Sequence, residues 1–301
     1  MNKYRYSEIF SSIQGEGYYT GVPTMWVRWF LCNLQCSGFG QTNPADESTW
    51  VLPYKEFDIS QIKRVEDLPV WDKGCDSSYS WAKKYKHLSP EETVAEIADR
   101  IEALMRNDFN PHGRFAHPHA RQVQHLCMTG GEPMLKKTQA GMVELIRELQ
   151  HRNNFPQYIT IETNGTQLPT RELIDLIEEK YTLTRMEWFW SVSPKLLHTS
   201  GEKASKAIHP EIVAEYARLS PAGQLKFVVR NDKVAWEELE ERVADFRKAG
   251  VAWDVWVMPV GATVEEQSDD DTRAVVEETI RRGYNVSGRM HAYIWGNAIG
   301  T

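Results

Sequence analysis

Short apolar segments alternate with amphipathic ones along most of the chain. The apolar runs at 24–31, 122–128, 157–162, 187–193, 224–230, 252–258 and 289–295 have the length and composition of buried strands. The amphipathic stretches at 89–108, 140–150, 170–180, 233–249 and 264–283 have the spacing of helices. This alternation predicts βα units and an α/β fold with a mostly parallel sheet.

The first of these helices carries its own start signals. Ser89 is placed as an N-cap, Pro90 falls at the first helical position, and Glu92 is spaced to close a capping box. The spacing therefore predicts a helix that begins directly after Ser89. Its apolar residues on one face would be Val94, Ile97, Ile101 and Leu104.

One segment has no regular pattern. Residues 37–74 are rich in Asp, Pro, Gly and Ser and exceed ordinary loop lengths. Such a segment is typical of a functional loop or an inserted subdomain.

Composition excludes several classes of protein. An apolar fraction of 41% over 301 residues supports a large core and argues against disorder. The net charge of −7 argues against a broad nucleic-acid-binding face. No apolar run is long enough for a membrane span, and "MNKYRYSEIF" lacks the apolar core of a signal peptide. We therefore expect a cytoplasmic protein that binds neither nucleic acid nor membrane.

The chemically unusual residues follow the predicted strands. Cys32 and Cys36 come after the first run, "TGGEP" (129–133) after the second and "ETNG" (162–165) after the third. "SPK" (193–195) and "MPVG" (258–261) follow later runs. Because ligands bind at the carboxyl ends of parallel strands, these motifs predict one site assembled from several strands.

Individual motifs at this rim allow two interpretations each. The glycines of "TGGEP" would let the backbone approach a ligand, and Glu132 could receive a cationic group, but a plain strand-to-helix turn has the same pattern. Lys195 could be a solvated surface charge, but its position at this rim favours a role in anion binding. Glu162 ends an apolar strand, where a carboxylate is costly unless it is paired or liganded.

The four cysteines do not follow a regular metal-binding pattern. Three residues separate Cys32 from Cys36, but after two further residues the next position is Phe39, which cannot bind a metal. A zinc site normally needs four ligands or three and a water, and no histidine accompanies these cysteines at zinc-finger spacing. A structural, non-metal role is the other alternative. Cys127 lies within an apolar run and is expected to be a buried small side chain.

Taken together, the motifs resemble the 7-carboxy-7-deazaguanine synthase family of the radical S-adenosylmethionine (SAM) superfamily. "FSSIQGEGYYTGVPTMWVRWFLCNLQC" (10–36) is similar to its N-terminal signature, and "GCDSSYSW" (74–81) to the stretch that begins at its third cluster cysteine. "TGGEP", "ETNG", "SVSPK", "LKFVV", "MPVG" and "RMHAYIWG" follow in the family's order. The resemblance implies one domain, 1–301, with an incomplete (βα) barrel and an insertion at 37–74.

The family's cofactors are implied with it. Cys32, Cys36 and Cys75 would hold a [4Fe–4S] cluster that leaves one iron to chelate SAM. Ser77 replaces the family's Mg²⁺-binding threonine and keeps its oxygen ligand. The implied cofactor-binding positions are Gly130, Gly131, Glu132, Glu162, Ser193, Pro194, Lys195 and Met258.

The implied reaction converts 6-carboxy-5,6,7,8-tetrahydropterin to 7-carboxy-7-deazaguanine with loss of ammonia, as in queuosine-type biosynthesis. Arg28 matches the family's arginine that grips the substrate carboxylate, a task that suits a guanidinium fork. An outward-facing Arg28 and a purely structural His291 are the alternatives. The remaining substrate-binding positions are Ile13, Gln14, Gly15, Glu16, Thr129 and His291.

The resemblance also implies partners: an electron donor such as a flavodoxin, and a second copy in a homodimer. Two other functions compete with this one. The first is another small radical SAM enzyme, such as a glycyl-radical activase, and the second is a non-catalytic binding protein on the same fold.

Overall fold

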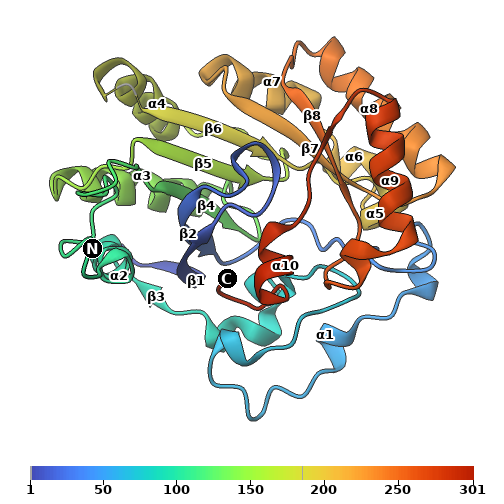
Figure 1. Cartoon of the computed structure of the whole chain (residues 1–301), viewed down its shortest axis with the longest axis horizontal. Helices are drawn as coiled ribbons and strands as arrows, with labels where there is room; N and C mark the ends of the chain where they lie inside the picture. The colour runs from blue at the N-terminus through green and yellow to red at the C-terminus, as the bar shows by residue number, and fades with distance from the viewer. Residues whose placement is uncertain (1, 185) are drawn as a thin grey trace.

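A single curved sheet organises the chain. The computed structural model describes residues 2–184 and 186–301. In these ranges nine strands form one sheet in the order β3-β1-β2-β4-β5-β6-β7-β8-β9 (Figure 1). The strands are β1 (Tyr4–Ile13), β2 (Pro23–Trp29), β3 (Glu91–Glu92), β4 (His125–Gly130), β5 (Tyr158–Thr163), β6 (Glu187–Val192), β7 (Gly223–Val229), β8 (Asp254–Pro259) and β9 (Asn285–Val286).

The strand directions match an incomplete βα barrel. From β2 through β4 to β9 every neighbouring pair is parallel, whereas β1 is antiparallel to both β2 and β3. Because β3 and β9 are the two edges, the sheet does not close. The predicted α/β class and mostly parallel sheet are confirmed.

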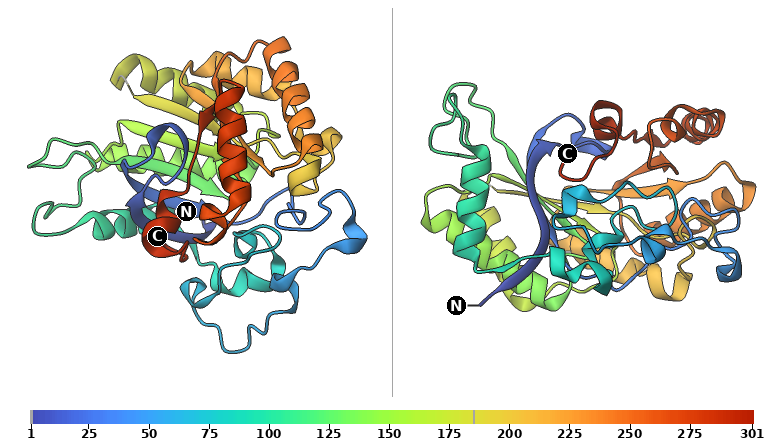
Figure 2. Two further views of the ribbon diagram at one scale, coloured as in Figure 1. Left: turned by 45° about the vertical axis from the view of Figure 1, so that its right-hand side comes forward. Right: turned by 90° about the horizontal axis from the view of Figure 1, so that it is seen from below.

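Helices cover the outer face of the sheet (Figures 1 and 2). Helix α2 packs on α3, α3 on α4, α4 on α7 and α7 on α8, which makes a continuous outer layer. None of the helices within residues 2–184 and 186–301 is long and apolar enough to cross a membrane. The helices are α1 (Pro53–Glu56), α2 (Val94–Met105), α3 (Lys136–His151), α4 (Arg171–Thr184), α5 (Leu197–Ser200), α6 (Ala204–Ala207), α7 (Pro210–Leu219), α8 (Lys233–Lys248), α9 (Asp270–Arg281) and α10 (Met290–Trp295).

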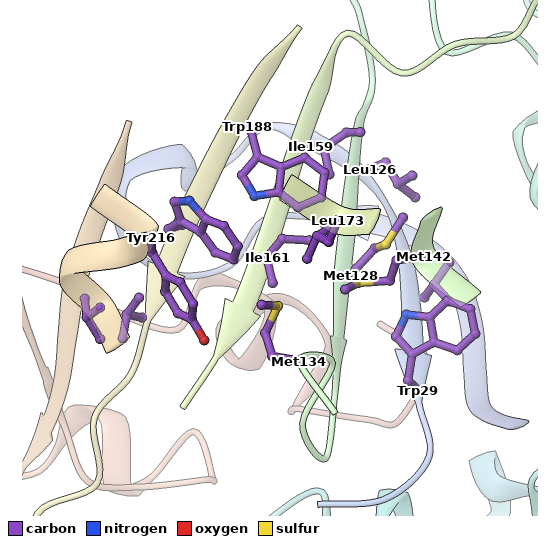
Figure 3. Packing of buried hydrophobic residues seen from close by; sticks show 14 of the residues in the cluster. Trp29, Leu126, Met128, Met134, Met142, Ile159, Ile161, Leu173, Trp188 and Tyr216 are labelled. Atoms are coloured by element: carbon purple, nitrogen blue, oxygen red, sulfur yellow. The ribbon is translucent and has the colours of Figure 1, made fainter. Parts of the chain in front are cut away.

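Alternation along the strands separates the core from the site. Every second strand residue points at the helices and joins one large apolar cluster, as Met128, Ile161 and Trp188 do (Figure 3). The residues between them face the concave side, where polar side chains such as Arg28, Glu162 and Lys226 lie among apolar ones such as Trp26 and Val228. The sheet thus has an apolar outer face and a mixed inner face that carries the charged groups.

Two predicted elements are wrong. Residues 289–295 form no strand: the last strand is β9, and Met290–Trp295 is helix α10, which ends at Gly296 with φ +66°. The helix α2 begins after Thr93, not Ser89, and Glu96 completes the capping box. Glu91 and Glu92 instead form β3, because they pair with the exposed edge of β1. Strand β1 and helix α7 lie outside the elements that the sequence predicts.

Residues 37–74 fold without strands and build a second apolar cluster. Tyr54, Val65, Leu68 and Trp71 pack with Tyr79 and its neighbours from the segment that follows. In Figures 1 and 2 these loops lie beside the barrel, near α10 and the end of the chain. The single-domain division with an inserted segment stays a prediction.

Candidate active site

A cavity of about 270 Å³ opens at the carboxyl ends of the strands. All three cysteines of the predicted cluster motif line it, although Cys75 is separated from Cys36 by residues 37–74. Cys32 and Cys75 pack against the same small group of side chains as Cys36. The three thiols of the interrupted motif therefore line the same cavity.

The neck of the inserted segment explains how Cys75 returns. The Gly74 amide donates to the Phe39 carbonyl at 2.8 Å, which fastens the two ends of the segment to each other. A side chain at Gly40, which has φ +66°, would lie 2.2 Å from the Asp72 carbonyl oxygen. Only glycine allows this approach, so the long segment leaves and re-enters the site at nearly the same point.

The loop after β2 is held by a carboxylate that sequence analysis missed. Glu202 accepts from the amides of Gln35 at 2.7 Å and Cys36 at 2.9 Å. Leu31 and Cys36 have positive φ values of 94° and 51°, which non-glycine residues rarely adopt. The loop is therefore constrained to present its two thiols to the cavity.

The thiols are protonated in the metal-free protein. Burial raises the pKa of Cys32 to about 12 and raises the pKa values of Cys36 and Cys75 as well. The Lys195 ammonium opposes this shift at Cys36. Binding of a metal at these sulfurs would therefore release protons. Within the described residues, no three His, Cys, Asp or Glu side chains converge closely enough to hold one metal ion.

Cys127 lies apart from these three thiols. It is fully buried on β4 and does not line the cavity. This confirms the expectation of a small buried side chain.

Strand β2 places Arg28 on the polar inner face. Its Nε donates to Glu8 Oε1 at 2.5 Å, and the Tyr79 hydroxyl donates to the same oxygen at 2.7 Å. Arg28 is thus neither outward-facing nor unpaired. Burial raises the pKa of Tyr79 well above its usual value, so its hydroxyl stays a donor.

A second group of charged side chains joins strand β7 to the segments after β1 and before α10. Lys226 on β7 is paired with Glu16 and lies 3.8 Å from a Glu162 oxygen. Arg289 lies 3.4 Å from Glu16 and 3.1 Å from Asp76. Burial alone would raise the pKa of Glu16, but Lys226 and Arg289 hold it well below its usual range. Glu16 is therefore ionised at neutral pH.

Close backbone approaches explain the glycines of two motifs. A side chain at Gly15 would come within 1.9 Å of His291 Nδ1, so this glycine admits the imidazole. Side chains at Gly130 and Gly131 would meet the Trp29 and Leu31 carbonyl oxygens at 2.5 and 2.3 Å. The "TGGEP" glycines therefore let the turn lie directly against the end of β2.

Burial lowers the pKa of His291, which favours its neutral form.

Glu132 and Pro194 are the two predicted site residues that do not line the cavity. Glu132 is fully buried behind it and accepts from Thr163 Oγ1 at 2.6 Å and from the amides of Met134 and Asn164. It joins the "TGGEP" and "ETNG" turns and receives no cation in these contacts. The residues that do line the cavity are Ile13, Gln14, Gly15, Glu16, Arg28, Cys32, Cys36, Cys75, Ser77, Thr129, Gly130, Gly131, Glu162, Ser193, Lys195, Met258 and His291.

Some cavity residues were missed, and the signals for them differ. Lys226 interrupts the apolar run 224–230, and strict alternation would have placed it on the inner face. Arg289 lies within an apolar run whose conformation was wrongly predicted. Glu8 and Tyr79 carry no local signal in the sequence.

An incomplete βα barrel with three cysteines and a glycine-rich turn at its strand ends resembles the architecture of radical SAM enzymes. Comparison with known proteins finds similarity to enzymes of one named activity. The 7-carboxy-7-deazaguanine synthase of Pyrobaculum aerophilum is 28% identical over 298 residues, which cover 98% of this chain and 96% of the relative. That of Rhodopirellula baltica is 28% identical, covering 98% and 88%. The chain is thus similar to 7-carboxy-7-deazaguanine synthases over nearly its full length, as its motifs predict.

Structural comparison supports the fold. The crystal structure of QueE from Escherichia coli superposes with a TM-score of 0.52 and 20% sequence identity, covering 95% of this chain and 93% of that one. No protein-family model matches the sequence.

Proposed function

We propose that the protein is a radical SAM lyase that converts 6-carboxy-5,6,7,8-tetrahydropterin to 7-carboxy-7-deazaguanine with loss of ammonia, for queuosine-type biosynthesis. One observation carries the proposal: motif residues from Ile13 to His291, separated along the whole chain, line a single cavity. The same cavity joins a cysteine-rich end to a charged end, as a reaction between a metal-bound cofactor and a polar small molecule requires.

The cysteine-rich end fits an iron–sulfur cluster. The donor set is three thiols on one wall, and a multi-iron cluster is wider than one ion, so its ligands need not converge on a point. Cys32, Cys36 and Cys75 would hold [4Fe–4S], and Ser77, whose Oγ lies 3.6 Å from the Cys75 sulfur, would offer an oxygen to Mg²⁺. When bound, the cluster and SAM would supply radical chemistry, with a 5′-deoxyadenosyl radical as the agent that abstracts hydrogen.

The rim motifs would hold SAM beside the cluster. Gly130 and Gly131 present backbone without side chains, and Met258 adds an apolar surface. Lys195 donates to Ser193 Oγ at 2.9 Å and keeps its ammonium toward the thiols and any bound carboxylate. Glu162 faces the cavity, whereas Glu132 and Pro194 would act by shaping the turns behind it.

The charged end would recognise the pterin. Arg28 would receive the substrate carboxylate, and ionised Glu16 offers an acceptor for ring N–H groups. The Gln14 amide donates to a Glu162 oxygen at 3.3 Å, which keeps both side chains at the cavity wall. Lys226 and Arg289 fix these acidic groups, and neutral His291 adds a further ring nitrogen.

Partners follow from this chemistry. Reduction of the cluster needs a one-electron donor such as a flavodoxin, and we propose a homodimer in the reducing cytoplasm, where thiol ligands stay free of disulfides. Residues 37–74 would act as an insertion in a single domain and close one side of the cavity, because Val70, Trp71 and Asp72 line it.

Anaerobic reconstitution with iron and sulfide tests the cluster assignment. The wild type should bind about four iron atoms per chain, and Cys75→Ala should lose most of them. Cys127→Ala is the matched control, because Cys127 is a buried cysteine that does not line the cavity. Equal iron in both variants would contradict the assignment of Cys75.

Turnover then tests the reaction itself. With reductant, SAM and carboxytetrahydropterin, the reconstituted wild type should form a 7-deazaguanine product. A complete cluster that cleaves SAM but leaves the pterin unchanged would favour another radical SAM activity, such as activation of a glycyl-radical protein. An intact fold that binds no cluster would favour the non-catalytic alternative.

A further inference from the structure

The orientation of Arg28 is set by two residues for which the motifs give no role. Glu8 Oε1 accepts a hydrogen bond from Arg28 Nε, and the Tyr79 hydroxyl donates to the same oxygen. Within the described ranges, no side chain or carbonyl accepts from the terminal nitrogens of Arg28, which lines the cavity. One edge of the fork is therefore occupied, and the other is left for a ligand.

A β-bulge aims Glu8 at this point. Tyr4 and Tyr6 on β1 belong to the apolar core, and strict alternation would send Glu8 to the same side. The register shifts between Tyr6 and Glu8: Tyr6 lies opposite Trp29, and Glu8 opposite Arg28. The extra residue turns Glu8 to the inner face, which is how bulges re-aim side chains beside active sites.

The burial of Glu8 and Tyr79 shows that their placement beside Arg28 has an energetic cost. Glu8 is 5% exposed and Tyr79 is 4% exposed, yet both line the cavity. A buried carboxylate is costly unless it is paired, and Glu8 has only one oxygen engaged, since Oε2 has no partner among the described residues. The pair therefore leaves the terminal nitrogens of Arg28 without a protein partner among the described residues.

We propose that Glu8 and Tyr79 are positioning residues that hold Arg28 by its Nε edge, so that its two terminal nitrogens receive the substrate carboxylate. The hydrogen bond from Tyr79 holds the Glu8 oxygen beside Nε. It thereby prevents the Glu8 carboxylate from rotating toward the terminal nitrogens of Arg28, where it would compete with the substrate. Tyr79 lies four residues after Cys75, and the Ser80 carbonyl accepts from the Leu31 amide at 2.8 Å. Recognition of the substrate carboxylate is thereby tied to the loop that carries the third cysteine.

The proposal rests on the proposed function for the identity of the ligand. Its test compares the affinity of the reconstituted protein for 6-carboxypterin and for pterin, two stable fluorescent probes that differ only in the carboxylate. The ratio of the two dissociation constants measures how much the carboxylate contributes to binding. In Tyr79→Phe this preference should fall about tenfold, because the terminal edge is no longer kept open.

Two further variants separate positioning from general damage. Glu8→Asp keeps the charge but withdraws the oxygen by one methylene group, and it should lose the preference in the same way. Tyr85→Phe is the matched control: Tyr85 is another buried phenol of this region, it donates to the Tyr54 carbonyl, and it does not line the cavity. It should keep the wild-type preference.

A double-mutant cycle decides whether Tyr79 acts through Arg28. In an Arg28→Gln background, Tyr79→Phe should have no further effect on the preference. An equal loss with and without Arg28, or an unchanged preference in both Tyr79→Phe and Glu8→Asp, would overturn the positioning role while leaving the proposed function intact. A wild type without any preference for the carboxylate would overturn both.

Discussion

A buried histidine makes the stability of the protein depend on pH. His125 is stacked on Tyr158 with ring centroids 4.6 Å apart, and Tyr19 meets it edge-on at 4.6 Å. Burial lowers the pKa of His125 from 6.5 to about 4. The folded state therefore keeps this imidazole neutral in a range where the unfolded chain binds a proton.

The sign of the effect follows from linkage. Between about pH 6.5 and 4 the unfolded state binds more protons at His125, so the free energy of unfolding falls as the pH is lowered. His125→Phe keeps an aromatic ring in the stack and removes the titration. We expect a shallower decline of the urea midpoint in the variant over this range and parallel curves above pH 7. An identical slope in both proteins would contradict the assignment.

Single residues differ in how far the sequence could place them. Arg28 and Glu162 could be placed at the cavity because family motifs mark their positions, although alternation alone left the direction of Arg28 open. Glu8 could not be placed, because a bulge reverses its side and leaves no trace in local composition. Cys75 could be expected at the cavity only by resemblance, since its return depends on the contact between Gly74 and Phe39 across the neck of the inserted segment.

The start of α2 shows the same limit for an element. Ser89-Pro90 with Glu92 has the composition of a helix start, but β1 recruits Glu91 and Glu92 into an edge strand, and Arg5 pairs with Glu91 at 2.7 Å. The misassigned strand at 289–295 has another cause. A short apolar run does not distinguish helix from strand by period, and only Gly296 marks a helix end there.

The corrected boundary gives a quantitative prediction. Thr93 accepts from the Glu96 amide, and Glu96 accepts from the Thr93 amide at 2.8 Å. Thr93→Ala should therefore lower the free energy of unfolding by about 1 kcal/mol. Ser89→Ala is the control, and it should be close to neutral. Urea denaturation measures both, and a larger loss in Ser89→Ala would restore the helix start read from the sequence.

At the scale of the whole molecule, two large apolar clusters stabilise different parts of the structure. The large cluster between sheet and helices supports the barrel, and the smaller one packs residues 37–74 onto the segment after Cys75. Trp71 belongs to the smaller cluster and also lines the cavity, whereas its neighbour Phe57, whose ring centroid lies 5.3 Å away, does not line it. The inserted segment thus contributes a wall that can be weakened without touching the barrel core.

Access to the thiols reports on that wall directly. In the metal-free protein Trp71→Ala should increase the rate at which a bulky disulfide reagent modifies Cys32, Cys36 and Cys75, because thiol reactivity depends on exposure as well as on pKa. Phe57→Ala should loosen the same cluster but change the rate of thiol modification much less. Cys127 should stay unreactive in both variants. An equal increase in the two variants would mean that the segment protects the site only by general packing. A selective, several-fold increase in Trp71→Ala would establish this side chain as the barrier between solvent and the cysteines.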